Sequence, residues 1–177
     1  ESFPHTPLYN VDTLSATISE PMTLLTDLLL AGLALTLSVR LRRSAAGHDR
    51  YAAAWWSVAL FATGIAALAG GIWHGFFEWF SPPVAGALWR VTVWSIGVAS
   101  CAMLLATVQA RVALPWRRLL RALAIAQFTI YALWMTLHHE FVWVILDYAP
   151  AMLVVLALHG WAFWRSRSPP RCTRASS

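Results

Sequence analysis

The stretch AAWWSVALFATGIAALAGGIWHGFF, residues 53–77, contains no Asp, Glu, Lys or Arg. At about 1.5 Å per residue, it forms a helix about 37 Å long, enough to cross a hydrocarbon core of about 30 Å. Backbone groups in lipid must find their hydrogen bonds inside the protein, so such a run must be helical. The stretch therefore predicts a transmembrane helix.

Four other apolar runs predict the same structure, over residues 21–39, 84–109, 119–137 and 141–164. Of the 177 residues, 59% are hydrophobic and 12% are charged, about half the charged share of a soluble protein. We predict an all-α, polytopic integral membrane bundle of five transmembrane helices over residues 21–164. This composition excludes a soluble enzyme.

The placement of charge predicts the orientation of the bundle. The chain has no lysine, and every arginine except Arg90 flanks the first or third connection or follows the fifth run. Five crossings bring these arginines to one side, which the positive-inside rule makes cytoplasmic. We therefore predict an outer N-terminal tail over residues 1–20 and a basic cytoplasmic tail over residues 165–177. The Arg-only, Ala-rich and Trp-rich chain indicates a bacterial inner membrane.

The positive charge is a signal of topology and not of nucleic-acid binding. Aromatic and basic residues do not alternate, and a Gly-rich phosphate loop is absent from the sequence, so nucleic acid is excluded as a partner. Membrane lipids are the expected partners. A homo-oligomer and a larger membrane complex both stay open, because lipid-facing and partner-facing apolar surfaces have the same composition.

Four ionisable residues on four different helices fall at a similar depth: Asp27, His74, Arg90 and Asp147. Each lies about 5–10 Å below the predicted outer boundary, counted at the helical rise. Ionisable residues inside a membrane are functional candidates, because burying them in lipid is expensive. We expect the four groups to meet in one layer.

A second set of polar residues lies closer to the outer boundary: Glu20, Glu78, His138, His139 and Glu140. Thr23 shares a helix face with Glu20 and Asp27, and His74 is four residues from Glu78, which places that pair on one face as well. The sequence therefore predicts a polar pocket in the outer leaflet that opens outward.

Three interpretations of the inner layer stay open. In the first, Asp27 and Asp147 flank Arg90 in a structural ion-pair network. In the second, Asp27, His74 and Asp147 bind zinc or another divalent metal with a water in the open position, and Glu78 or Glu140 acts as the catalytic general base. In the third, the layer binds a small molecule or a lipid headgroup without metal.

Three segments resemble the alkaline ceramidase and adiponectin-receptor group of membrane hydrolases. Glu20–Asp27 resembles the Glu-Pro-x-Asn-x-x-Ser-Asn segment at the first helix of its bacterial members, and Gly71–Phe76 resembles the segment with the second-helix zinc histidine. Phe141–Trp143 stands where the family has His-Phe-x-Trp-His. The resemblance implies an intramembrane zinc that activates water against an amide in a lipid. Only His74 carries over directly, and Glu20 carries over more loosely.

The chain departs from that family at several positions. The family has seven helices, and Glu140 and Val144 stand where it has paired histidines. Gly70 replaces a serine, and Arg90 lies in a helix where an acid is expected. The overall pattern also resembles an uncharacterised family of small bacterial five-span proteins, which implies no function.

The sequence thus favours a membrane protein with an outward-facing polar pocket, either a metal-dependent lipid-amide hydrolase or a metal- or lipid-binding protein. One alternative is a structural or accessory subunit of a membrane complex. A further alternative is a haem- or pigment-binding protein, with haem held by His74 and either His138 or His139.

Overall fold

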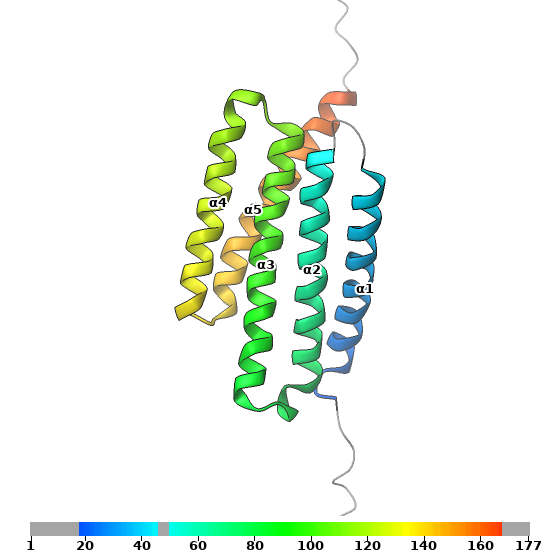
Figure 1. The fold of residues 1–177 in the computed structure, drawn as a ribbon, viewed down its shortest axis with the longest axis vertical. Coiled ribbons are helices and arrows are strands. Elements are labelled where there is room, and N and C mark those ends of the chain that lie inside the picture. Colours follow the sequence, from blue (N-terminus) through cyan, green and yellow to red (C-terminus); the bar gives the residue numbers. More distant parts are fainter. Residues whose placement is uncertain (1–17, 46–49, 168–177) are drawn as a thin grey trace, which may run out of the picture.

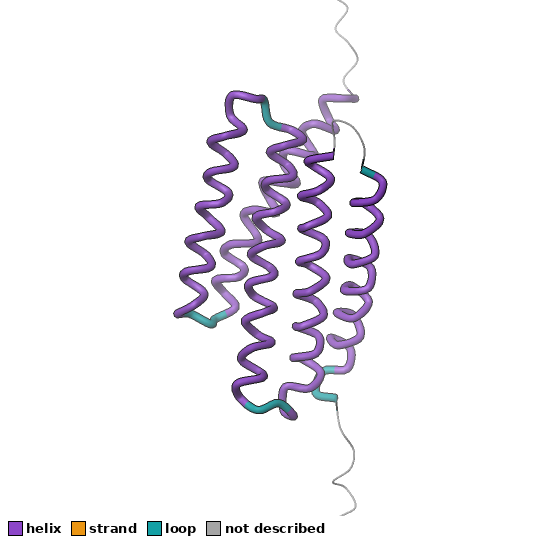
Figure 2. Tube along the Cα trace, in the orientation of Figure 1, coloured by secondary structure: helices purple, strands orange, loops and turns teal. Residues whose placement is uncertain are grey.

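The computed structural model describes residues 18–45 and 50–167. Within these ranges the chain is helical and has no strand (Figure 2). The elements are α1 (Pro21–Ser44), α2 (Arg50–Phe76), the 3₁₀ helix η3 (Phe77–Trp79), α3 (Pro82–Arg111), α4 (Leu114–Leu137) and α5 (Phe141–Arg167). Five of these segments are long and apolar enough to span a membrane. This confirms the predicted all-α chain with five membrane-length helices, while its orientation stays a prediction.

Three of the helices begin at prolines, and several extend beyond the apolar runs. α1, α3 and α4 each have a proline in the first turn, where the missing N–H has no intrahelical partner to lose. α1 was predicted to end at Val39 but continues to Ser44. Arginine is a good helix former, so the charged ends remain helical after the apolar pattern stops.

α3 is the centre of the bundle. The first four helices lie side by side in sequence order, and α5 lies behind α3 (Figure 1). α3 contacts α2, α4 and α5, whereas α4 and α5 touch each other only sparsely. Along α2 and α3 the buried positions are mostly small, among them Ala59, Ala66, Ala99, Ala102 and Ala106. Small residues let helix backbones approach closely without a hydrophobic driving force from water.

Interhelical hydrogen bonds join α1 to α2 and α3 to α4. The Ser38 hydroxyl donates to the Ser57 carbonyl at 2.8 Å, and the Ser57 hydroxyl donates back to the Ser38 carbonyl at 3.0 Å. On the other side of the bundle, the Tyr131 hydroxyl of α4 donates to the Val93 carbonyl of α3 at 2.8 Å. Such bonds are worth about 0.6 kcal/mol each in a membrane protein.

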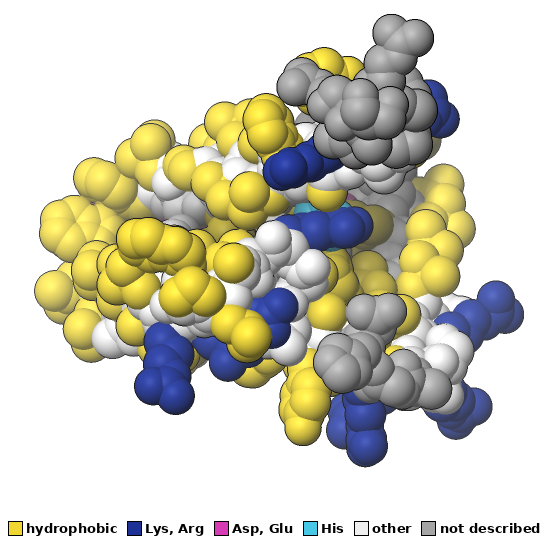
Figure 3. All heavy atoms as spheres, turned by 90° about the horizontal axis from the view of Figure 1, so that it is seen from above, with side chains coloured by type: hydrophobic (Ala, Val, Ile, Leu, Met, Phe, Trp, Pro, Cys, Tyr) yellow, Lys and Arg dark blue, Asp and Glu magenta, His cyan; other side chains and the backbone are white. Residues whose placement is uncertain are grey.

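The two ends of the bundle carry different charges. One end, called here the arginine-rich end, holds the last turn of α1, the first turn of α2, the α3–α4 connection and the last turn of α5. Figure 3 looks onto it and shows arginines in dark blue, with no carboxylate of the described residues in view. The opposite end holds Glu20, His74 and the His138–Glu140 connection and is called the histidine end. The predicted segregation of charge is therefore present in the fold.

Candidate functional site

A cavity with a volume of about 400 Å³ opens between α1 and α5, over α2 and α3, in the half of the bundle toward the histidine end. We call it the acid–histidine cavity. It is lined by Thr23, Asp27, Leu30, Thr63, Ala66, Ala67, Gly70, His74, Trp89, Thr92, Ile96, Ala99, Phe141, Val144, Ile145 and Tyr148.

Each wall of the cavity is one face of a helix. The α5 residues Phe141, Val144, Ile145 and Tyr148 follow the spacing of residues on a single helical face. The α2 wall has the same spacing and consists largely of small residues, so it forms the hollow. The cavity therefore results from small side chains on α2 facing larger ones on α5.

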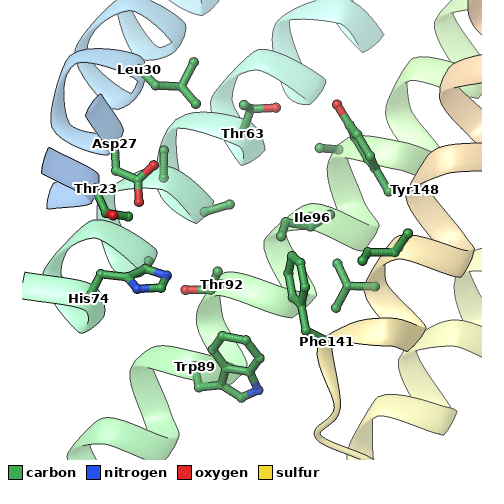
Figure 4. Close-up of a pocket in the computed structure, with 16 residues that line it drawn as sticks. Thr23, Asp27, Leu30, Thr63, His74, Trp89, Thr92, Ile96, Phe141 and Tyr148 are labelled. Atoms are coloured by element: carbon green, nitrogen blue, oxygen red, sulfur yellow. The ribbon is translucent and has the colours of Figure 1, made fainter. Parts of the chain in front are cut away.

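Asp27 lies in the second turn of α1, and its half-buried carboxylate faces this cavity (Figure 4). It makes no hydrogen bond or ion pair with the described residues. The Gly70–Gly71 pair makes room for it: a Cβ added at Gly71 would lie 2.8 Å from the Asp27 Cβ. The glycine pair thus allows α1 to approach α2 closely with Asp27 at the contact.

His74 lies near the end of α2 and lines the same cavity. Its Nδ1 is 3.1 Å from Glu20 Oε2, although the geometry falls short of a hydrogen bond. The Ser19 backbone N–H donates to the Gly75 carbonyl at 3.2 Å and so holds the segment before α1 against α2. The Trp73 ring meets the imidazole edge-on, with centroids 5.1 Å apart. Glu20, Asp27 and His74 are therefore brought to one place.

Helices α2, α3 and α5 supply further polar groups to the cavity, which the sequence analysis did not select. The Tyr148 hydroxyl extends into the cavity (Figure 4) and makes no hydrogen bond with the described residues. Thr63 and Thr92 donate to carbonyls of their own helices at 2.9 and 3.0 Å, which leaves their oxygens as acceptors. The signal for Tyr148 was its helical spacing from Phe141.

Asp147 does not belong to this cavity. It is buried, and its Oδ1 accepts a hydrogen bond from Gln127 Nε2 of α4 at 3.0 Å. It lines a different groove, between α4 and α5. Asp147 and Tyr148 are consecutive and so point about 100° apart around α5, and it is Tyr148 that faces the cavity. The predicted ligand set of Asp27, His74 and Asp147 is therefore not brought together.

Arg90 does not join the two aspartates either. It is exposed, and its Nε donates to the Gly86 carbonyl of its own helix at 3.2 Å. It lines a separate hollow with Trp73, Trp89 and His139. The Asp27–Arg90–Asp147 ion-pair network, one of the three interpretations of this layer, is not formed by the described residues. The three side chains line three different hollows.

Glu78 and Glu140, the predicted general bases, lie outside the acid–histidine cavity. α2 ends at Phe76 and the chain continues into η3, so His74 and Glu78 do not share a helix face as predicted. Glu140 is exposed beside α5 and accepts a hydrogen bond from the Trp143 indole at 3.2 Å. Hydrogen bonds from its own backbone N–H and from Trp143 hold the pKa of Glu140 below its usual value.

The two histidines of the α4–α5 connection also face other groups. His138 stacks on Trp134 with ring centroids 3.9 Å apart, and the His139 carbonyl accepts a hydrogen bond from the Trp89 indole at 3.0 Å. Across residues 18–45 and 50–167, no three His, Cys, Asp or Glu side chains are grouped so as to hold a metal ion. The metal and haem sites stay predictions.

Comparison with known proteins gives a family but no function. The chain matches no curated protein. It matches no solved structure. Residues 22–172, which include nearly all of the five helices, match the family of unknown function DUF6962. The match covers most of the sequence, and the chain therefore belongs to the DUF6962 family.

Proposed function

We propose that this protein binds a lipid-like amphipathic molecule in the acid–histidine cavity, with the polar head at Asp27 and His74. The observation that carries the proposal is the Asp27 carboxylate, which faces the cavity without a hydrogen bond or ion pair to the described residues. The apolar part of the molecule would lie against Ile96, Val144 and Ile145.

The energetic argument is that unpaired polar groups inside a membrane are expensive. Asp27, the Tyr148 hydroxyl and the Thr23 hydroxyl all line a largely apolar cavity, and none of the three has a hydrogen-bond partner within the described chain. A bound molecule with complementary donors and acceptors removes that cost. The cavity volume of about 400 Å³ is in the range of small-molecule sites.

The position of the opening supports a ligand that comes from the lipid. The cavity lies between α1 and α5, and these two helices make few or no contacts with each other, whereas α1 packs extensively on α2. The gap between them faces the side of the bundle. A molecule dissolved in the bilayer reaches Asp27 by this route without first crossing an aqueous phase.

The charge of the site indicates the chemistry of the polar head. Glu20 and Asp27 are two acids beside one histidine. An acidic site favours a head that donates hydrogen bonds or carries positive charge, such as an amide, a hydroxyl or an amine. A phosphate head is disfavoured by like-charge repulsion.

The same proposal includes an orientation. The positive-inside rule places the arginine-rich end in the cytoplasm, so the acid–histidine cavity lies in the outer leaflet of a bacterial inner membrane. Reaction of single cysteines placed at the two ends with a membrane-impermeant thiol reagent in intact cells measures this directly. Labelling at the arginine-rich end from outside would contradict the orientation.

The test of binding is to extract and identify, by mass spectrometry, the small molecules that copurify with the protein from its own membranes. Asp27→Asn and Tyr148→Phe should lose the compound. Thr26→Val is the matched control, because Thr26 is adjacent to Asp27 but exposed and bonded within its own helix. Equal recovery from wild type and Asp27→Asn would reject the proposal.

Elemental analysis of the same samples tests the metal-dependent hydrolase. Near-stoichiometric zinc in wild type that is lost in His74→Ala would extend the proposal to a metal-bound water acting on the ligand. A ligand recovered without metal would leave binding as the function.

A further inference from the structure

A second groove, with a volume of about 370 Å³, lies between α2 and α4 over α3, in the half of the bundle toward the arginine-rich end. Its walls include Trp55 and Val58 of α2, Val98 and Leu105 of α3, and Ile125 and Phe128 of α4. We call it the Arg121 groove, after the arginine that also lines it. We propose that it binds one anionic phospholipid from the adjoining leaflet, with the phosphate at Arg121. This inference does not depend on the ligand of the acid–histidine cavity.

The length of the groove matches one leaflet. On α3 it extends from Gln109, close to the helix end at Arg111, to Val98. At the helical rise that distance is about 16 Å, against about 15 Å for half of a hydrocarbon core. The apolar side chains along the groove can therefore contact an acyl chain from the headgroup level to the middle of the membrane.

Arg121 carries a charge that the described protein does not neutralise. Its backbone lies two turns inside α4, while its guanidinium donates to the Gln109 side chain, nearer the helix end. Gln109 is neutral, and Arg121 has no ion pair among the described residues. Long arginine side chains extend toward the headgroup level in this way. A lipid phosphate at the mouth of the groove supplies the missing negative charge and accepts a bidentate hydrogen bond.

The surroundings favour a lipid whose net charge is negative. The arginine-rich end presents many arginines and no carboxylate of the described residues in Figure 3. Tyr51, exposed at the start of α2, lies at the mouth of the groove with Gln109 and adds a hydroxyl at the headgroup level. An anionic headgroup in the groove gains about 1 kcal/mol, or about fivefold in affinity, from the arginine beside it.

The test is native mass spectrometry of the full chain with an equimolar mixture of phosphatidylglycerol and phosphatidylcholine that carry the same acyl chains. Wild type should retain one phosphatidylglycerol in preference. Arg121→Gln should reduce that preference about fivefold, and Arg121→Lys should keep it. Arg118→Gln is the matched control, because Arg118 is exposed on the same helix. Val98→Trp should fill the groove and lower the retention of both lipids.

Three results would overturn the inference. Wild type with no preference between the two lipids would show that the groove does not select charge. An Arg121→Gln variant with the wild-type preference would show that the phosphate lies elsewhere. Equal losses in Arg118→Gln and Arg121→Gln would show a general basic surface and not a site.

Discussion

Asp27 and Asp147 are the carboxylates inside the five α-helices of the described chain, and their surroundings differ. Asp147 is 9% exposed and accepts a hydrogen bond from Gln127. Asp27 is half-buried and faces a cavity without a hydrogen bond or ion pair among the described residues. The Asp147 carboxylate has a hydrogen-bond donor within the protein, whereas the Asp27 carboxylate is free to bind a ligand. The comparison separates a structural acid from a binding acid.

The difference arises from what packs beside each residue. Asp147 lies where α5 faces both α3 and α4, close to Gln127 and Tyr131. Asp27 lies where α1 packs mainly on α2, across the Gly70–Gly71 pair, and its remaining side faces the cavity. The peripheral helix α1 therefore presents Asp27 to a cavity. Helix α5, which packs on the central helix α3, presents Asp147 to a hydrogen-bond donor on α4.

The largest expected effect is overpacking of the closed region around Asp147. A Cβ added at Gly97 overlaps the Tyr131 ring, which is buried and tied to Val93. Gly97→Ala should therefore reduce the free energy of unfolding by about 2–3 kcal/mol, measured by thermal unfolding in detergent. Gly32→Ala is the control, since nothing lies within 4 Å of its added Cβ. Equal melting temperatures for the two variants would contradict the close packing of α3 and α4.

Replacing Asp27 and replacing Asp147 should have different effects on the free energy of unfolding. Asp147→Ala removes the shorter of the two hydrogen bonds that Gln127 Nε2 donates to this residue and keeps only the longer one, to the backbone carbonyl at 3.4 Å. It should lower the free energy of unfolding by about 1–2 kcal/mol. Asp27→Ala should not lower it, because no hydrogen bond or ion pair with the described residues is lost and an unpaired carboxylate is removed. Asp147→Leu combined with Gln127→Leu should recover most of the loss, since no unpaired polar group remains. A larger loss from Asp27→Ala than from Asp147→Ala would reverse the assignment.

A smaller effect is expected at the glycine pair. Gly71→Ala brings a Cβ to 2.8 Å from the Asp27 Cβ and should displace the carboxylate at a cost of about 1 kcal/mol. Retention of the copurifying compound should fall more than stability does. At Gly70 the nearest contact is 3.4 Å, to Thr92 Cγ2, so Gly70→Ala should have the weaker effect on retention. A stronger loss from Gly70→Ala would place the polar head nearer Thr92.

The smallest effect is expected at Glu140, outside both regions. Hydrogen bonds from its own backbone and from Trp143 lower its pKa, so the folded state favours the charged carboxylate. The stabilisation is present above the pKa of the unfolded chain and is lost as the pH falls through the lower, folded value. Glu140→Gln should therefore melt slightly below wild type at neutral pH, and the difference should disappear in acid. A difference that grows in acid would contradict this sign.

The five helices could be predicted from the sequence, but the directions in which their side chains point could not. The apolar runs and the prolines at Pro21 and Pro82 determine where chain segments become helical, and the helical rise gives depth. Which side chains of a helix point into a cavity depends on which neighbouring helices it packs against. For this reason Arg90 was expected beside Asp27 at the same depth, yet it bonds to its own helix and points elsewhere.

The cavity was only partly visible in the sequence. Asp27, His74 and Thr23 were selected as polar residues, and they do line it. Tyr148 was not selected, because the neighbouring Asp147 was the more conspicuous residue, and a single face of α5 holds only one of them. The pairing of Asp147 with Gln127 depends on the contact between two helices, which local sequence patterns do not specify.

The most direct test of the distinct roles of Asp27 and Asp147 is native mass spectrometry of wild type, Asp27→Ala and Asp147→Ala purified in parallel. It reports the bound small molecule and the folded fraction in one sample. We predict that Asp27→Ala stays folded and loses the molecule, whereas the folded part of Asp147→Ala retains it. A molecule that remains on Asp27→Ala, or that is lost from folded Asp147→Ala, would contradict the assignment of Asp27 as the binding acid.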